Sequence, residues 1–185
     1  MKFASPNQSL YCRFARWYDA LFEAFFSKGR AQTVSVLNVQ PGESLLISGI
    51  GTGLDIPLLP QDALITGVDF SEEMLAVARQ RTGGRPITLL QMDAQNLSFE
   101  DAAFDAVLLN LIVSVAPDGN RVFREAWRVL KPGGRLAIFD KFAPEGEEVS
   151  LFRRLAGAII NWFGTDINRR LSDILAGADD YTVEY

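Results

Sequence analysis

Three glycines at alternate positions follow a short apolar run. Residues 45–47 are Leu-Leu-Ile, and the chain then passes through Ser48 into Gly49, Gly51 and Gly53. This pattern predicts a buried strand that turns tightly into a helix, where bare backbone can approach a ligand closely. Such a turn aims N–H groups and the positive end of a helix at an anion, here a phosphate or an amino-acid carboxylate. A dinucleotide fingerprint would need glycine at position 54, which is Leu54, and no Walker-type Gly-Lys-Ser/Thr ending is present.

A carboxylate is expected beside this turn. Residues 63–68 form a second apolar run that ends at Asp69, twenty residues past Gly49. On the neighbouring strand of a parallel sheet, a carboxylate at this spacing meets a ribose diol. Ser71 is the expected N-cap of the following helix, with Glu72 and Glu73 in its first turn.

Strand-like and helix-like segments alternate around these residues. The expected strands are 44–48, 63–68, 86–91, 104–110 and 135–140, and the expected helices are 9–27, 30–39, about 54–59, 71–81 and 119–130. That rhythm predicts a doubly wound, mostly parallel α/β sheet with helices on both faces.

The motifs together resemble S-adenosylmethionine-dependent methyltransferases with a Rossmann-like fold. Residues 47–53, 68–71 and 92–97 look like that family's first three motifs, and residues 130–135 look like the turn before its fifth strand. The resemblance covers roughly residues 10–180, and the length of 185 residues predicts a single domain over 1–185. We divide that domain into an N-terminal helical cap (1–40), a cofactor-binding core (41–140) and a C-terminal helix and strand (141–185). One position departs from the family, which usually has an acidic residue where this chain has Ile47.

The resemblance implies S-adenosylmethionine as the cofactor and assigns residues to it. The methionyl end belongs to the glycine turn, the ribose to a carboxylate and the adenine to an aromatic face and a second acidic residue. The residues concerned are Gly49, Ile50, Gly51 and Gly53 in the turn, Asp69 at the ribose, and Phe70, Asp93 and Ala94 at the adenine. Asn110 ends the fourth strand, where ligands of open α/β sheets bind. Its amide is expected to hold the amino-acid end of the cofactor or to face the acceptor, with an ordinary turn residue as the alternative.

Within the family, residues 16–22, 28–30 and 111–118 look like bacterial soluble phosphatidylethanolamine N-methyltransferases. Quinone-ring methyltransferases share the Tyr-Asp pair, so both acceptor classes stay open. Tyr18 and Asp19 are the candidate catalytic residues that shape the acceptor site. An amine must lose a proton before it attacks, and Asp19, Tyr18, Asp140 or water could take that proton.

Composition excludes several other chemistries. The 185 residues contain no histidine and one cysteine, Cys12, and carry a formal net charge of −5. Histidine metal ligands, a histidine general base and an internal disulfide are therefore absent, and no metal is expected. An acidic chain does not favour nucleic acid as a partner. Neither a signal peptide nor a membrane span is apparent, so we expect a cytoplasmic protein.

The two ends of the chain are rich in basic and aromatic residues. Residues 1–40 contain five basic and two acidic side chains, and similar residues recur over 151–163. These stretches are either ordinary core and solvated helix faces or a lid that touches anionic lipid, which would make the protein peripheral at the inner membrane surface.

The chain has one strand-like run near its end, 181–184, and nothing in it supplies the additional antiparallel strand that the family normally has between its fifth and sixth strands. Either the chain is shortened relative to the family, or another chain covers the gap, for example in a homodimer. Three functions are left to compare: a lipid amine methyltransferase, a methyltransferase for a quinone ring or a soluble small molecule, and a non-catalytic cofactor-binding or interaction protein.

Overall fold

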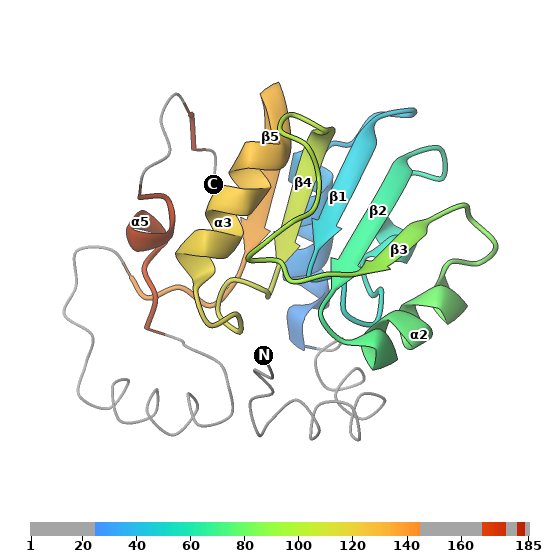
Figure 1. Cartoon of the computed structure of the whole chain (residues 1–185), viewed down its shortest axis with the longest axis horizontal. Coiled ribbons are helices and arrows are strands. Elements are labelled where there is room, and N and C mark those ends of the chain that lie inside the picture. The colour runs from blue at the N-terminus through green and yellow to red at the C-terminus, as the bar shows by residue number, and fades with distance from the viewer. Residues whose placement is uncertain (1–24, 145–167, 177–180, 184–185) are drawn as a thin grey trace.

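The computed structural model describes residues 25–144, 168–176 and 181–183. Its centre is a five-stranded sheet in the order β3-β2-β1-β4-β5, and every neighbouring pair is parallel. The strands are β1 (Ser44–Ser48), β2 (Leu64–Asp69), β3 (Thr88–Gln91), β4 (Phe104–Asn110) and β5 (Leu130–Phe139). The expected Rossmann-like α/β fold is confirmed (Figure 1).

Helices cover both faces of the sheet. The described residues include a short 3₁₀ helix, η1 (Ile56–Leu58), and the α-helices α2 (Glu72–Arg81), α3 (Gly119–Val129) and α5 (Leu171–Ile174). A further helix spans residues 25–37. In Figure 1, α3 lies in front of the sheet and the helix over 25–37, drawn in blue, lies behind it. Because parallel strands need crossover connections, this two-sided cover is the expected result.

Each face of the sheet has its own apolar core. Leu46, Val107 and Leu109 point toward α3 and pack with Phe123 and Val122. The residues between them in sequence point the other way, toward the helix over 25–37 and η1; this second core includes Val34, Leu37, Leu45, Ile47, Ile56 and Leu108. The alternation follows from the two-residue side-chain period of a strand.

The structure corrects the expected N-terminal helices. One helix runs without a break from residue 25 to residue 37, although Lys28-Gly29 was expected to separate a helix ending at 27 from one starting at 30. Gly29 lies against the last residue of β5, since a Cβ atom on it would come within 2.2 Å of Phe139 Cζ. Close packing on the sheet therefore explains this glycine, and the rest of the expected helix 9–27 lies outside the described residues.

Two further expectations were wrong. The segment after the glycines is a single 3₁₀ turn, Ile56–Leu58, and not a helix over 54–59, with Pro57 inside it. A proline is tolerated in the first turn of a helix, so Pro57 does not end it; Pro60 follows the extended C-cap Leu59, and the residue before a proline disfavours helical backbone, which explains why the turn stops there. At the other end, residues 181–183 form no strand, and Tyr181 packs edge-on against Trp127 of α3 with ring centroids 6.2 Å apart.

Candidate functional site

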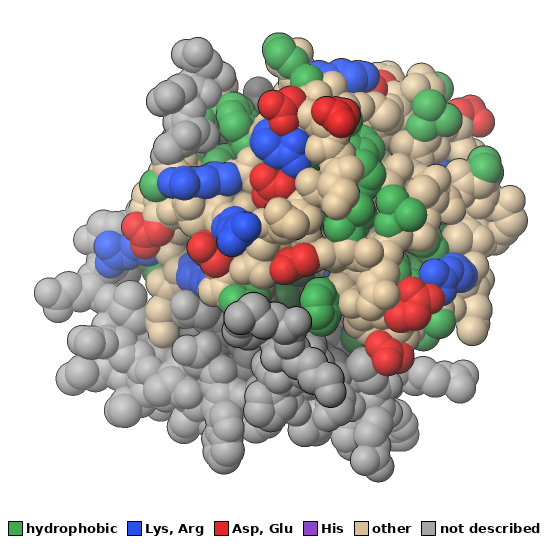
Figure 2. All heavy atoms as spheres, viewed as in Figure 1, with side chains coloured by type: hydrophobic (Ala, Val, Ile, Leu, Met, Phe, Trp, Pro, Cys, Tyr) green, Lys and Arg blue, Asp and Glu red, His purple; other side chains and the backbone are tan. Residues whose placement is uncertain are grey.

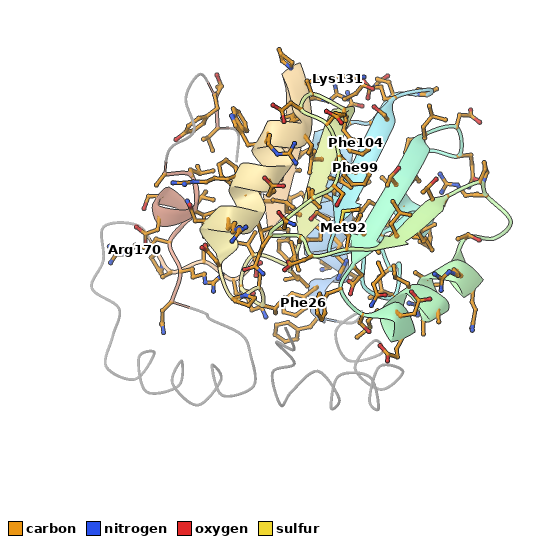
Figure 3. All side chains as sticks on the ribbon, viewed as in Figure 1. Phe26, Met92, Phe99, Phe104, Lys131 and Arg170 are labelled. Atoms are coloured by element: carbon orange, nitrogen blue, oxygen red, sulfur yellow. The ribbon has the colours of Figure 1, made fainter. Side chains whose placement is uncertain are left out.

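The carboxyl ends of β1, β2 and β4 meet at one edge of the sheet. β1 pairs with β2 and β4 on its two sides, so the glycine turn after β1 lies between the ends of both neighbours. In Figure 3, Phe26 marks this edge, which is the lower edge in that view. Open α/β sheets bind their ligands in this position.

The N–H groups of the glycine turn are used within the protein. Gly49 and Ile50 both donate to Val68 O at 2.9 Å, and Gly53 donates to Ile50 O at 3.0 Å. Gly51 donates to Asp69 Oδ2 at 2.8 Å. The expectation that these N–H groups point freely at an anion was therefore wrong for these four residues. The turn is instead tied to the end of β2.

The glycines differ in what surrounds them, although all three have positive φ. A Cβ atom on Gly49 would lie 2.6 Å from the side chain of Ile112, and one on Gly53 would lie 2.8 Å from Ile56 Cδ1. Gly51, with φ +56°, has no atom of the described residues within 4 Å of the same position. Within the described part of the chain, the backbone at Gly51 thus faces open space that a ligand could occupy.

Asp69 holds its carboxylate beside Gly51. Oδ2 accepts from Gly51 N at 2.8 Å, and Oδ1 accepts from Ser71 N at 2.9 Å. Burial raises the pKa of Asp69 above its ordinary value, while the bonds from Ser71 and Gly51 oppose that shift. Each oxygen keeps an acceptor position, so the group can receive two hydroxyl donors such as a ribose diol. Ser71 is the N-cap of α2, as expected, and accepts from Met74 N.

The proposed adenine residues lie next to Asp69. Phe70 is 51% exposed, so its ring is available for stacking, and its carbonyl accepts from Gln91 Nε2 at 3.0 Å. Asp93 Oδ1 accepts from Gln95 N at 2.9 Å, which makes it the first residue of a local turn. Ala94 is buried behind that turn. The structure thus places Asp93 as a turn residue, and its bond to an adenine amine stays a prediction.

Two residues of the first motif belong to the core. Ile47 is fully buried among the apolar side chains behind the sheet. Ile50 is also buried, and its Cδ1 lies 2.4 Å from where a Cβ atom on Gly67 would be. Neither side chain therefore reaches a ligand, and Ile50 offers only its backbone.

Sequence reasoning missed a buried polar network at the same edge. Asp55, just after the glycines, is 1% exposed and accepts from Arg30 of the helix over 25–37 and from Asn110 Nδ2 at 2.9 Å. The available signal was a charged residue, Asp55, inside the apolar run from Leu54 to Leu59. Its partners lie 25 and 55 residues away, which no local pattern shows.

Asp140 lies just past the end of β5 and joins two loops. Its Oδ2 accepts from Ser114 N at 2.8 Å, and its Oδ1 accepts from Lys141 N at 2.8 Å. Nearby, Phe26 packs edge-on against Phe139 and lies under Lys141 Nζ at 5.6 Å. Tyr18 and Asp19, the candidate catalytic residues, lie outside the described residues.

The described site contains a carboxylate, an exposed aromatic ring, an open glycine backbone and a buried amide. It contains no covalent nucleophile next to a base, and no group of three acidic, cysteine or histidine residues in the described ranges is arranged to hold a metal ion. Among the same residues, no helix is long and apolar enough to cross a bilayer. The carboxylate, the exposed ring and the glycine backbone are groups that suit a nucleoside-containing cofactor, whose own chemistry would do the work.

Comparison with known proteins defines the class. Residues 46–138 match a family described as a methyltransferase domain. The chain is 36% identical over 157 residues to phosphatidylethanolamine N-methyltransferase of Cereibacter sphaeroides, covering 82% of this chain and 77% of that protein. It is 29% identical over 179 residues to demethylmenaquinone methyltransferase of Symbiobacterium thermophilum, covering 88% and 71%.

A solved structure agrees in fold. A putative methyltransferase of Bacillus halodurans superposes with a TM-score of 0.70 at 24% identity, covering 79% of this chain and 66% of that one. The chain belongs to the S-adenosylmethionine-dependent methyltransferase family, with a Rossmann-like fold. The resemblance found in the sequence motifs is thereby confirmed.

Proposed function

We propose that this methyltransferase transfers a methyl group to the amine of an ethanolamine phospholipid or a similar amphiphile. The observation that supports this acceptor is the 36% identity to a phosphatidylethanolamine N-methyltransferase over 82% of the chain. Matches to demethylmenaquinone methyltransferases support a competing proposal, a quinone-ring acceptor.

The residues at the sheet edge fit S-adenosylmethionine. Asp69 has one acceptor position left on each oxygen for the ribose hydroxyls, and Phe70 presents an exposed ring to the adenine. The described residues leave space at the Gly51 backbone for the cofactor. The bound cofactor supplies a sulfonium methyl group, so the chain needs no metal or covalent residue for the transfer.

The chain must present a neutral amine in line with that methyl group and keep water away. An alkylammonium acceptor has no free lone pair, so a base has to remove its proton first. Asp140 is the described carboxylate at the end of β5, and Tyr18 and Asp19 are the other candidates. Asp140 accepts two backbone N–H bonds, which hold its carboxylate at the edge of the site.

An acceptor comparison tests the proposal. The purified protein is incubated with S-adenosylmethionine labelled in its methyl group, together with vesicles containing phosphatidylethanolamine, dispersed demethylmenaquinone or water-soluble phosphoethanolamine. We expect label in the phospholipid headgroup, and none when Asp69 is replaced by Ala. Label in the quinone alone would replace the lipid acceptor with a ring carbon, and label in phosphoethanolamine alone would point to a soluble acceptor.

A further inference from the structure

A buried ion pair joins the helix over 25–37 to the segment after the glycines. Arg30 Nη1 donates to both oxygens of Asp55 at 2.8 Å, and the two side chains are only 14% and 2% exposed. Removing two charges from water costs about as much as their attraction returns, so a buried pair is weak evidence of a role in stability. The pair also contacts a third side chain.

The third partner is the amide of Asn110 at the end of β4. Asn110 Nδ2 donates to Asp55 Oδ1 at 2.9 Å. A carboxylate can only accept, whereas an asparagine amide has a donor side and an acceptor side. Asp55 therefore selects one of the two amide orientations, with the NH₂ group toward Asp55 and Oδ1 away from it.

Asn110 Oδ1 is buried and has no hydrogen-bond partner in the described part of the chain. The residue is 4% exposed, and leaving a buried acceptor without a hydrogen bond is unfavourable. Such atoms are rare in folded proteins and call for a ligand, a water molecule or a functional reason. Asn110 Oδ1 thus has room in its bonding for a hydrogen-bond donor that the described residues do not supply.

The position of Asn110 indicates which donor. β1 and β4 pair through Ile47 and Leu108, so two residues further along Asn110 is level with Gly49. Ile112, two residues past Asn110, would touch a Cβ atom on Gly49. The free oxygen thus lies beside the glycine turn, where the amino-acid end of the cofactor is expected. Ile47, in the core on the same face of the sheet, has no polar atom to serve that end.

We propose that Asp55 and Arg30 are positioning residues that hold Asn110 Oδ1 as the acceptor for the ammonium group of the cofactor. Arg30 balances the charge of Asp55, Asp55 orients the amide, and Asn110 accepts from the ammonium group. The inference rests on the proposed use of S-adenosylmethionine. It assigns the positioning of the Asn110 amide to Asp55, just after the glycine turn, and to Arg30 of the helix over 25–37.

Two ligands isolate the ammonium group. S-adenosylhomocysteine carries it, and the deaminated analogue has hydrogen in its place but keeps the carboxylate and the nucleoside. Titration calorimetry gives the ratio of the two dissociation constants for each variant. For the unmodified protein we expect the deaminated analogue to bind at least about tenfold more weakly, since a hydrogen bond to a charged group contributes about 1.5–3 kcal/mol.

Three variants test the chain of contacts. Asn110→Ala removes the acceptor, and Asp55→Asn lets the amide of Asn110 turn over, so both should bring the ratio to within about twofold of one. If Asp55→Asn fails to fold because Arg30 is left unpaired, the double variant Arg30→Gln, Asp55→Asn removes both charges. Arg85→Gln is the matched control, because Arg85 holds the same turn through Ile56 O at 2.9 Å without contacting Asn110. Its ratio should equal that of the unmodified protein.

The outcomes separate the inference from the proposed function. A folded Asp55→Asn or double variant that keeps the original ratio overturns the positioning role. A ratio near one in the unmodified protein overturns the assignment of the ammonium group to Asn110. Failure of the unmodified protein to bind S-adenosylhomocysteine at all would instead overturn the use of this cofactor.

Discussion

Asp69 is the residue on which we expect cofactor binding to depend most. Its two oxygens already accept N–H bonds from Gly51 and Ser71, so it is fixed before any ligand arrives. This fixed geometry reduces the entropy that binding would otherwise cost. Hydroxyl donors require the ionised carboxylate, which makes protonation of this group a direct test.

We expect cofactor affinity to fall as the pH is lowered through the raised pKa of Asp69. Burial moves that pKa above 3.8, so the loss begins at a higher pH than it would for an exposed aspartate. The stability of the free protein changes with pH in the opposite direction. A raised carboxyl pKa favours the folded state when Asp69 is protonated, and this contribution to stability is lost as the pH rises through that pKa. Titrating S-adenosylhomocysteine across the acid range measures the first effect. Asp69→Asn should bind more weakly by about 1–3 kcal/mol and lose this pH dependence; an unchanged pH profile would contradict the role of Asp69.

Gly51 allows a second residue-scale prediction. Gly51→Val should weaken cofactor binding, because the new side chain would fill the open space beside Asp69 and because φ is +56°. The strain alone costs about 1–2 kcal/mol, and Gly42→Val is its control, with φ +80° and no atom near its Cβ position. The melting temperature should fall by a similar amount in both variants, while only Gly51→Val should bind the cofactor more weakly. Equal affinity in the two would show that the cofactor lies elsewhere.

At the scale of elements, one carboxylate ties three strands together at the opposite edge. Asp105 of β4 accepts from Ser44 N at 2.9 Å and Ser44 Oγ at 2.6 Å in β1. It also accepts from Lys131 Nζ of β5 at 2.7 Å. Figure 3 places Lys131 at the upper end of the sheet, away from Phe26. The strands that carry the site are therefore aligned from the far end.

These bonds make stability depend on pH. The hydrogen bond from Lys131, followed by those from Ser44, lowers the pKa of Asp105 well below its usual range. The contribution is present above the pKa of the unfolded chain and is lost as the pH falls through the folded value. The Asp105 side chain is 32% exposed, so solvent screens its interactions. We expect Asp105→Asn to lower the free energy of unfolding by about 1 kcal/mol at neutral pH. Denaturant unfolding of the unmodified protein and of Asp105→Asn at pH 7 and pH 3 measures this effect. The difference in unfolding free energy between the two should be smaller at pH 3, and a difference that does not change with pH would show that the charge of Asp105 does not stabilise the fold.

The sequence pattern predicted most strands and helices of the sheet region, because side-chain periodicity and helix caps are set by residues close together in the sequence. The strand Ser44–Ser48 and the helix Glu72–Arg81 with its Ser71 cap follow from side-chain period and capping. The expected boundary between helices 9–27 and 30–39 is wrong, because the continuous helix depends on the fit of Gly29 against Phe139, which is a tertiary contact. The residues 131–134, expected as a turn, lie within β5 as an irregularity opposite Phe104 and Ala106. In the site, Asp69 followed from spacing, whereas the link from Arg30 to Asp55 is a contact between distant segments.

At the scale of the whole molecule, charge is unevenly placed along the sequence. Figure 2 shows acidic and basic side chains intermixed over the described part of the face that carries α3. Residues 1–40 carry three more basic than acidic side chains, and residues 41–140 contain thirteen acidic and eight basic ones. A lipid acceptor would have to be approached by the basic residues of 1–40 and 151–163, most of which lie outside the described residues.

We expect binding to vesicles to require anionic lipid and to weaken with added salt. Headgroup attraction contributes about 1 kcal/mol per basic residue and is screened within about 10 Å at 0.1 M salt. Arg153→Gln with Arg154→Gln should reduce vesicle sedimentation and leave affinity for S-adenosylhomocysteine unchanged. Arg121→Gln with Arg124→Gln, both exposed on α3, is the matched control and should bind vesicles normally. Indifference to anionic vesicles at low salt would favour a soluble acceptor.

The structure of the complex with S-adenosylhomocysteine tests the central claim most directly, namely that the edge formed by β1, β2 and β4 is the cofactor site. We predict both ribose hydroxyls within about 3.2 Å of the Asp69 oxygens and the adenine against Phe70. The ammonium group should lie at a similar distance from Asn110 Oδ1. A ligand bound elsewhere on the chain, or bound at this edge with its ribose away from Asp69, would contradict the account.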